Sequence, residues 1–177
     1  TNGAQEQGGT IAQGTPSPVA YPFSHHTLMC KALASGWCTS QFDIKTAFPT
    51  APMPEGVRVF CIPPKECATR TADGKLAYWE CKRNLYGGRT APKIFFRDLV
   101  QRTLLKFPGT ATQCDTDPCV FKFKAVLESG PVECWLSLHV DDGCLVSSSQ
   151  MAEDWFYTCL TDGEGGRHKY NINKGPL

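Results

Sequence analysis

The chain has 177 residues, of which 41% are hydrophobic, and a formal net charge of +1. This length supports one sizeable core and at most a second small lobe, so we expect one domain. The apolar runs are only a few residues long, as in Cys144 to Val146, whereas a membrane helix needs about 20, and we therefore exclude a membrane span. The chain opens at Thr1 without a secretion-type leader, and we expect it to be a piece of a longer protein.

Residues 1–18 are rich in Gly, Gln, Thr and Pro and show no periodicity, which predicts a flexible polar arm or linker. Residues 19–177 are then expected to form the folded domain. Apolar spacing over residues 26–37 predicts a short helix that stops near Gly36. A strand is predicted to run into Phe42, Asp43 and Ile44. Three prolines at positions 49, 52 and 54 predict a stiff loop after it.

Two β-like segments follow, over residues 57–62 and 76–80, with Asp73 and Gly74 in the loop between them. A helix is predicted over residues 92–107, because Pro92 suits the first turn of a helix. Its apolar residues lie on more than one side, so we expect it to be largely buried.

Ten cysteines are scattered along the chain, and none forms a Cys-x-x-Cys pair. We expect free thiols that behave as small buried hydrophobic groups. A secreted disulfide framework is disfavoured because the chain has enough apolar residues to build a core without it. A cysteine-rich zinc-binding module stays open as a third alternative for the function.

The basic residues are unevenly distributed. Between Lys82 and Lys106 there are seven basic residues and one acidic residue, a local charge of +6 in a chain whose total is +1. This pattern suits either a phosphate-facing surface or the solvated face of a helix. The candidate nucleic-acid-binding residues in this stretch are Lys82, Arg83, Lys93 and Arg97.

The stretch from Cys134 to Val146 carries the clearest pattern. Leu136, Leu138 and Val140 alternate with polar or aromatic residues, which predicts a strand with Asp141 on the face opposite this apolar row. The Asp142-Gly143 pair that follows predicts a hairpin turn. Two adjacent carboxylates are therefore expected at a hairpin tip, with Asp43 at the end of another strand.

Carboxylates at strand ends can bind Mg²⁺, which takes oxygen ligands from one or two carboxylates and from substrate phosphates. Two such ions stabilise the attacking and leaving oxygens of a phosphoryl transfer, as in polymerases. The structural alternative is that Asp-Asp-Gly simply makes a turn and that Asp43 is solvated.

Several segments resemble the motifs of copia-type retrotransposon reverse transcriptases. Gln41 to Phe48 is similar to their first catalytic motif, and His139-Val140-Asp141-Asp142 is similar to their carboxylate-pair motif. Further similar segments are Thr15 to Ala20, Asn84 to Pro92, and Asp117 to Val120. The chain departs from the family pattern at Pro49, Gly88, Thr90 and His139, none of which is an expected metal ligand.

The resemblance implies an α+β polymerase palm, an antiparallel sheet with helices packed on one face, plus partial fingers, truncated before the thumb. It implies that Asp43, Asp141 and Asp142 are catalytic and, with the Ile44 carbonyl, hold two Mg²⁺ ions, for which Mn²⁺ may substitute. Phe48 would be a steric gate against a ribose 2′-OH, and Gly87 and Arg89 would lie near the incoming nucleotide.

The implied activity is RNA-directed DNA polymerisation, the transfer of dNTPs onto a primer 3′-OH. The implied partners are an RNA or DNA template with its primer, dNTPs, and the rest of a polyprotein with thumb, RNase H and integrase. The implied location is a cytoplasmic virus-like particle or the nucleus. The alternative is a catalytically inactive relic that binds nucleic acid or a protein partner through its basic stretch.

Overall fold

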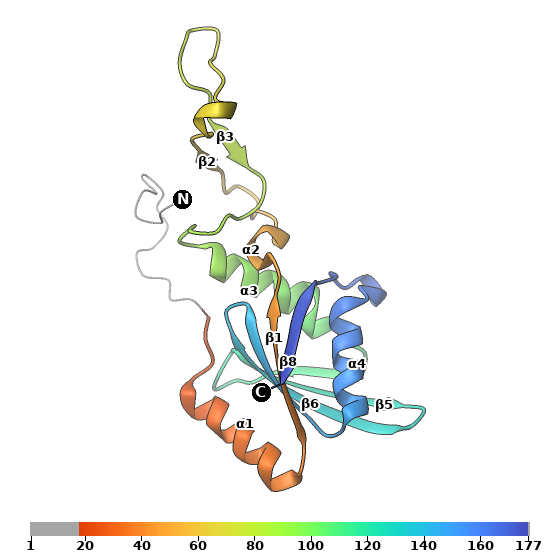
Figure 1. The fold of residues 1–177 in the computed structure, drawn as a ribbon. Coiled ribbons are helices and arrows are strands. Elements are labelled where there is room, and N and C mark those ends of the chain that lie inside the picture. Colours follow the sequence, from red (N-terminus) through yellow and green to blue (C-terminus); the bar gives the residue numbers. More distant parts are fainter. Residues whose placement is uncertain (1–17, 177) are drawn as a thin grey trace.

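The computed structural model describes residues 18–176, so the predicted polar arm lies outside the described residues except for Pro18. The main element is a six-stranded sheet with the order β4-β5-β6-β7-β1-β8, in which all neighbouring strands are antiparallel (Figure 1). Its strands are β1 (Cys38–Ile44), β4 (Thr110–Gln113), β5 (Val120–Leu127), β6 (Gly130–His139), β7 (Asp142–Ser147) and β8 (Ile172–Pro176). The expected α+β class is confirmed at this coarse level.

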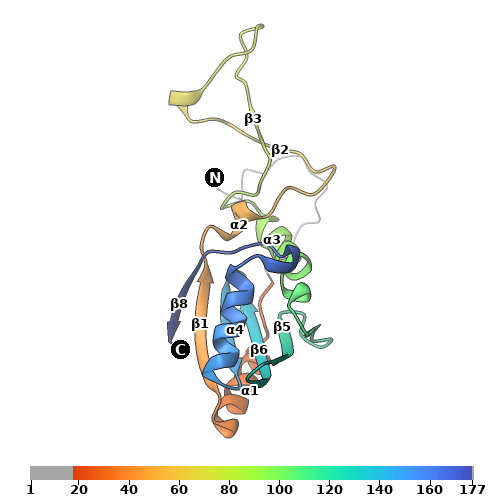
Figure 2. The same ribbon diagram turned by 90° about the vertical axis from the view of Figure 1, so that its right-hand side faces the viewer.

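Helices cover both faces of the sheet. Leu145 and Val146 are consecutive on β7 and therefore point to opposite faces. Leu145 belongs to the large core, which is shared with α3 (Ala91–Arg102) and α4 (Gln150–Thr161), whereas Val146 packs against α1 (Pro22–Ser35). The two faces are visible on either side of β1 in Figures 1 and 2. The expectation that helices pack on one face was wrong, because α1 buries Leu28 and Ala32 against the other one.

The predicted helices are present with shifted ends. The first, predicted over residues 26–37, begins at Pro22, since proline is tolerated in a first turn. It ends where predicted, with Gly36 in the left-handed conformation at φ 62°. The second stops at Arg102 rather than at residue 107, because Thr103 leaves helical geometry, and the 3₁₀ turn η3 (Leu104–Lys106) follows it.

A small lobe of two short strands projects from the sheet, as Figure 1 shows, made of β2 (Val59–Cys61) and β3 (Trp79–Cys81) with the 3₁₀ turn η2 (Lys65–Cys67) between them. Both strands are shorter than predicted. The predicted proline loop instead begins with the short helix α2 (Ala47–Thr50), which contains Pro49. A last 3₁₀ turn, η4 (Glu164–Gly166), connects α4 to β8.

The hairpin turn between β6 and β7 lies two residues earlier than predicted. His139 pairs directly with Asp142, so Val140 and Asp141 form the two-residue turn. Val140 has φ 62°, as expected for the first central residue of a type II′ turn, where glycine is preferred. Gly143 instead lies within β7, where an added Cβ would come within 2.3 Å of the Phe42 ring. Its small size therefore serves packing and not the turn.

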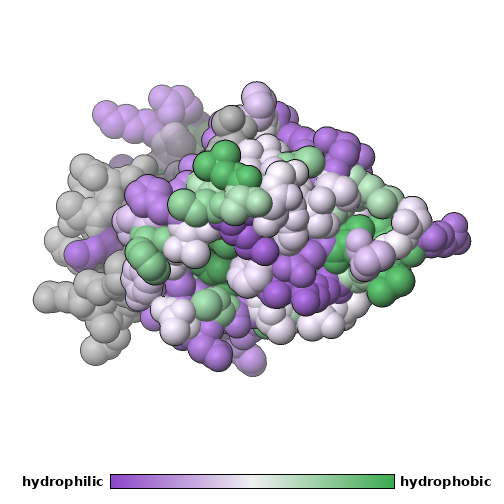
Figure 3. Space-filling model, turned by 90° about the horizontal axis from the view of Figure 1, so that it is seen from below, coloured by the Kyte–Doolittle hydropathy of each residue, from purple (hydrophilic) through white to green (hydrophobic). Residues whose placement is uncertain are grey.

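All ten cysteines, which lie within residues 18–176, are free thiols, as predicted, and four of them are buried. Apolar side chains also reach the surface, including Phe23 at 82% and Leu33 at 83% exposure. Seen from below, such apolar areas are separated by hydrophilic side chains (Figure 3). Among residues 18–176, no helix combines the length and apolar character needed to cross a membrane.

Candidate active site

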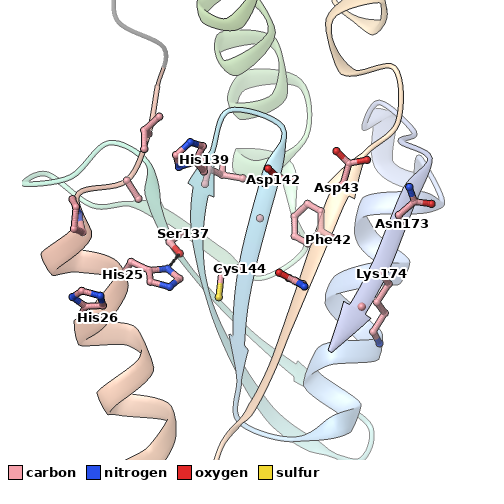
Figure 4. Close-up of a pocket in the computed structure, with 17 residues that line it drawn as sticks. His25, His26, Phe42, Asp43, Ser137, His139, Asp142, Cys144, Asn173 and Lys174 are labelled. Carbon is pink, nitrogen blue, oxygen red and sulfur yellow. Dashed lines mark hydrogen bonds between the residues drawn. The ribbon is translucent and has the colours of Figure 1, made fainter. Parts of the chain in front are cut away.

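A row of four polar side chains crosses one face of the sheet. Asp43 on β1 lies directly opposite Asp142 on β7 and opposite Asn173 on β8. His139 on β6 lies directly opposite Asp142. Directly opposite residues of antiparallel strands point to the same face, so these side chains stand side by side (Figure 4). We call Asn173, Asp43, Asp142 and His139 the acid row.

Asp141 lies in the turn at one end of this row. Its backbone carbonyl accepts a hydrogen bond from the Ile44 N–H at 3.0 Å, which ties the hairpin tip to the end of β1. Burial raises the pKa of the Asp141 carboxyl, and the negative charges of Asp142 and Asp43 raise it further. The three predicted catalytic carboxylates are therefore close enough to repel one another.

The chemistry of this donor set suits a hard divalent cation. A positive ion would relieve the repulsion that raises the pKa of Asp141. Among residues 18–176, no three His, Cys, Asp or Glu side chains are already arranged as a metal site. Mg²⁺ commonly takes only one or two carboxylates and completes its shell with water and substrate phosphates. Asp43, Asp141 and Asp142 fit that use, while the role of the Ile44 carbonyl stays a prediction.

An aromatic cluster adjoins the carboxylates. The Phe48 ring lies 4.9 Å from the Tyr86 ring and 6.1 Å from the Phe95 ring, measured between centroids. The pKa of Tyr86 is raised, first by burial and then by the charges of Asp141 and Asp43. Tyr86 therefore lies within electrostatic range of the carboxylates. Sequence reasoning included Tyr86 in a motif but gave it no role, and only the fold brings it to the site.

Gly87 occupies a turn that leads into α3. The Gly88 N–H donates to the Leu85 carbonyl at 3.1 Å, and Gly87 has φ 85°. A type II turn places its third residue at such a positive φ, which glycine adopts without a steric penalty. Arg89 is exposed just before α3. Contact of Gly87 and Arg89 with a nucleotide stays a prediction.

The four predicted nucleic-acid-binding residues differ in the contacts that they make within the protein. Lys82 forms an ion pair with Glu80 at 2.6 Å in the small lobe. The Arg83 guanidinium donates to the backbone carbonyls of Pro49 and Thr50, at 3.3 Å and 2.7 Å, and so holds the end of α2. Lys93 and Arg97 are exposed and four residues apart on α3, which places them on one side of that helix.

A groove with a volume of about 790 Å³ contains the acid row at its floor. One side is lined by Pro22, His25 and His26 of α1, and the other by residues 173–175 of β8. The His25 Nδ1 atom lies 3.1 Å from the Ser137 hydroxyl oxygen (Figure 4). Sequence reasoning missed His25 and Asn173, because only strand register and helix packing bring them to the carboxylates.

Comparisons with known protein families, with curated proteins and with solved structures found no match to this chain. The features of this chain that point to a function are the motifs in its sequence and the geometry of the acid row.

Proposed function

We propose that this chain is a reverse transcriptase fragment of a copia-type retrotransposon, which transfers dNTPs onto a primer 3′-OH. The observation that supports this proposal most is the convergence of Asp43, Asp141 and Asp142, which come from two distant motifs and meet at one end of the sheet. If these aspartates served only to make a turn or to contact solvent, they would have no need to lie close together, where their negative charges repel one another. Retaining this arrangement despite its cost is typical of a functional site.

Under this proposal the six-stranded sheet with α3 and α4 is the polymerase palm. The lobe of β2 and β3 is part of the fingers. The position of α2, which contains Phe48, between the sheet and the lobe (Figure 1) would then correspond to the floor of a nucleotide site.

Asp43, Asp141 and Asp142 would hold two Mg²⁺ ions with the Ile44 carbonyl, and Mn²⁺ would substitute for them. When bound, such ions lower the pKa of the attacking hydroxyl and neutralise charge on the leaving pyrophosphate. The protein itself contributes the placement of its carboxylates, which the hydrogen bond from Ile44 to the Asp141 carbonyl stabilises.

The aromatic pair of Phe48 and Tyr86 would form the wall beside the nucleotide sugar. Phe48 packs against Phe95 as well, so its ring is held and would resist displacement by a 2′-OH. Gly87 and Arg89 would approach the nucleotide from the turn before α3. Base pairing with the template would select the nucleotide, so that the protein needs no sequence readout.

The partners under this proposal are an RNA or DNA template with its primer, dNTPs, and the remaining polyprotein with thumb, RNase H and integrase. Contacts with nucleic acid would be mostly to phosphates and would weaken with salt. The location would be a cytoplasmic virus-like particle or the nucleus.

Primer extension tests the proposal. The protein, its Asp141→Asn Asp142→Asn variant and a Glu128→Gln control are incubated with a poly(rA) template, an oligo(dT) primer and dTTP, in Mg²⁺ and then in Mn²⁺. Glu128 is exposed and follows β5, at the other end of the sheet, so the control removes a negative charge away from the site. We expect extension by the wild type and the control and none by the double variant. Equal extension by all three proteins would contradict the proposal.

The alternative is a catalytically inactive relic that binds nucleic acid or protein. The exposed pair of Lys93 and Arg97 on α3 favours it, since these charges do not depend on the carboxylates. Three results together would support the relic. Oligonucleotide binding would survive replacement of Asp43, Asp141 and Asp142 by Asn, and no primer extension would be seen. Binding would weaken when Arg89, Lys93 and Arg97 are neutralised.

A further inference from the structure

The groove continues beyond the acid row over a second row of polar residues. Gln41 lies directly opposite Cys144, and Cys144 lies directly opposite Ser137. Each is two residues along its strand from a member of the acid row, which corresponds to a distance of about 7 Å. All three line the groove together with the acid row. A ligand that reaches the carboxylates can therefore extend along the floor of the same groove.

The α1 side of the groove differs in chemistry from its acidic end. From β6 to β8 the floor spans three strand spacings, or about 14 Å. The imidazoles of His25 and His26 line the α1 side, at the level of the second row, and Figure 4 shows both rings there. Donor groups thus lie next to the second row, away from the carboxylates of the acid row.

His25 is held in a defined orientation. Its Nδ1 atom lies 3.1 Å from the Ser137 hydroxyl oxygen, and the residue is half-buried. When the hydroxyl donates to Nδ1, the proton of the neutral ring is on Nε2, which then acts as a donor. An oriented N–H donor suits a phosphate oxygen, whereas the carboxylates of the acid row would repel a phosphate.

We infer that His25, oriented by Ser137, is a positioning residue that hydrogen-bonds the sugar–phosphate backbone of a nucleic-acid strand whose 3′ end lies at the acid row. This inference rests on the proposed polymerase function and adds the path of the growing strand. A single nucleotide would occupy the carboxylate end alone. A continuous strand uses both rows, with its terminal hydroxyl beside Asp43 and Asp142 and its preceding phosphate beside His25.

Three single variants test the inference. His25→Ala removes the ring, and His25→Gln keeps an amide donor of similar reach. Cys30→Ala is the matched control, since Cys30 is exposed on the same helix and outside the groove. The Kd for a fluorescein-labelled primer–template is measured by anisotropy without dNTPs, and the KM for primer and kcat are measured by extension.

We expect His25→Ala to raise the Kd and the primer KM by about tenfold or more, the effect of one hydrogen bond to a charged group. The kcat and the KM for dNTP should change less than twofold. His25→Gln should recover part of the binding, and Cys30→Ala should match the wild type. A merely structural role would give no rescue by Gln and would lower kcat with primer affinity unchanged.

The outcomes separate this inference from the proposed function. Unchanged primer binding by His25→Ala, with extension intact, would overturn the inference and leave the polymerase standing. Wild-type protein that neither binds nor extends the primer would overturn both. If circular dichroism shows that His25→Ala is unfolded, His25→Leu replaces it, because leucine fills the space without a donor, and equal primer affinity in His25→Leu and the wild type overturns the inference.

Discussion

Asp43 on β1 and Asp142 on β7 lie directly opposite each other on one face of the sheet. Like charges in this position destabilise an antiparallel pair. The pairing is imposed by the core, because the neighbouring residues Phe42 and Gly143 are also opposite each other and pack tightly on the other face. The carboxylates are thus held together by burial of the apolar groups behind them.

Removing one of these charges should stabilise the protein while abolishing extension. We expect Asp142→Asn to raise the free energy of unfolding by roughly 0.2–1 kcal/mol in metal-free buffer, the size of a cross-strand charge effect. Urea denaturation measures it, with Glu128→Gln as the control that should change little. A destabilised Asp142→Asn protein would contradict the proposed repulsion.

The pH dependence of stability should report Asp141. Its pKa is raised above the ordinary value of 3.8, first by burial and then by Asp142 and Asp43. The folded state therefore binds this proton more tightly than the unfolded state, and the contribution of Asp141 to stability should fall as the pH rises from 3.8 through the raised pKa. Asp141→Asn should match the wild type at lower pH and exceed its stability at higher pH.

Asp162 serves as a control, because its pKa is shifted in the opposite direction and its contribution to stability should change with pH in the opposite direction. Burial raises its pKa, but hydrogen bonds from the Glu164 N–H and from Arg167 lower it more, so the net pKa lies below 3.8. Asp162→Asn should therefore lose stability relative to the wild type as the pH rises through that lowered value and remain less stable above 3.8. Denaturation at a series of pH values distinguishes the two variants. The same pH dependence of the unfolding free energy in both would refute the opposite pKa shifts of Asp141 and Asp162.

Gly143→Ala should destabilise the sheet behind the acid row. The added Cβ would lie 2.3 Å from the Phe42 ring, which is buried and packs against Phe156 and Tyr157. We expect a loss of about 1–3 kcal/mol in unfolding free energy, typical of overpacking. Combining it with Phe42→Leu should recover part of that loss. Failure of the double variant to recover would mean that backbone displacement, and not the ring contact, is the cause.

The ion pair of Glu153 and Lys174 should anchor β8 and hence Asn173. The Lys174 Nζ atom lies 2.6 Å from Glu153, whose carboxylate is buried on α4, and 4.4 Å from the Tyr157 ring centroid. Lys174→Met should cost about 1–3 kcal/mol, because it leaves the buried Glu153 carboxylate without its partner while Lys174 itself is partly exposed to solvent. Glu153→Gln together with Lys174→Met should restore most of the stability. Thermal denaturation measures both, and an equal loss in the double variant would contradict this reading.

The basic residues should separate into structural and ligand-binding groups. Arg83→Ala should lower the unfolding free energy by about 1 kcal/mol, because its donors hold the carbonyls of Pro49 and Thr50. Its effect on the salt dependence of oligonucleotide binding should be small. Lys93→Ala with Arg97→Ala should instead reduce the slope of log K against log salt by up to about 1.8, with stability unchanged. A larger change in this slope from Arg83→Ala than from the double variant would mean that Arg83 binds the ligand and that Lys93 and Arg97 do not.

The sequence by itself predicted the helices and strands whose apolar periodicity is strong, including the end of α1 at Gly36 and the strand into Asp43. It also identified the three carboxylates through two motifs. These features depend on local spacing and on residue chemistry, which a chain carries in its order of residues. It misplaced the hairpin turn, because Asp-Gly favours a turn locally, whereas the packing of Gly143 against Phe42 requires this pair inside β7.

Only the tertiary structure decided which distant residues meet. Strand register placed Asn173 and His139 in one row with Asp43 and Asp142, and α1 brought His25 to Ser137. Arg83 belongs to the basic stretch, but its guanidinium donates a hydrogen bond to the carbonyl of Thr50 at the end of α2. Register and docking depend on burial summed over the whole core, and a shift of one residue would move every side chain to the other face. Local sequence patterns therefore specify the groups available for chemistry, and packing decides their neighbours.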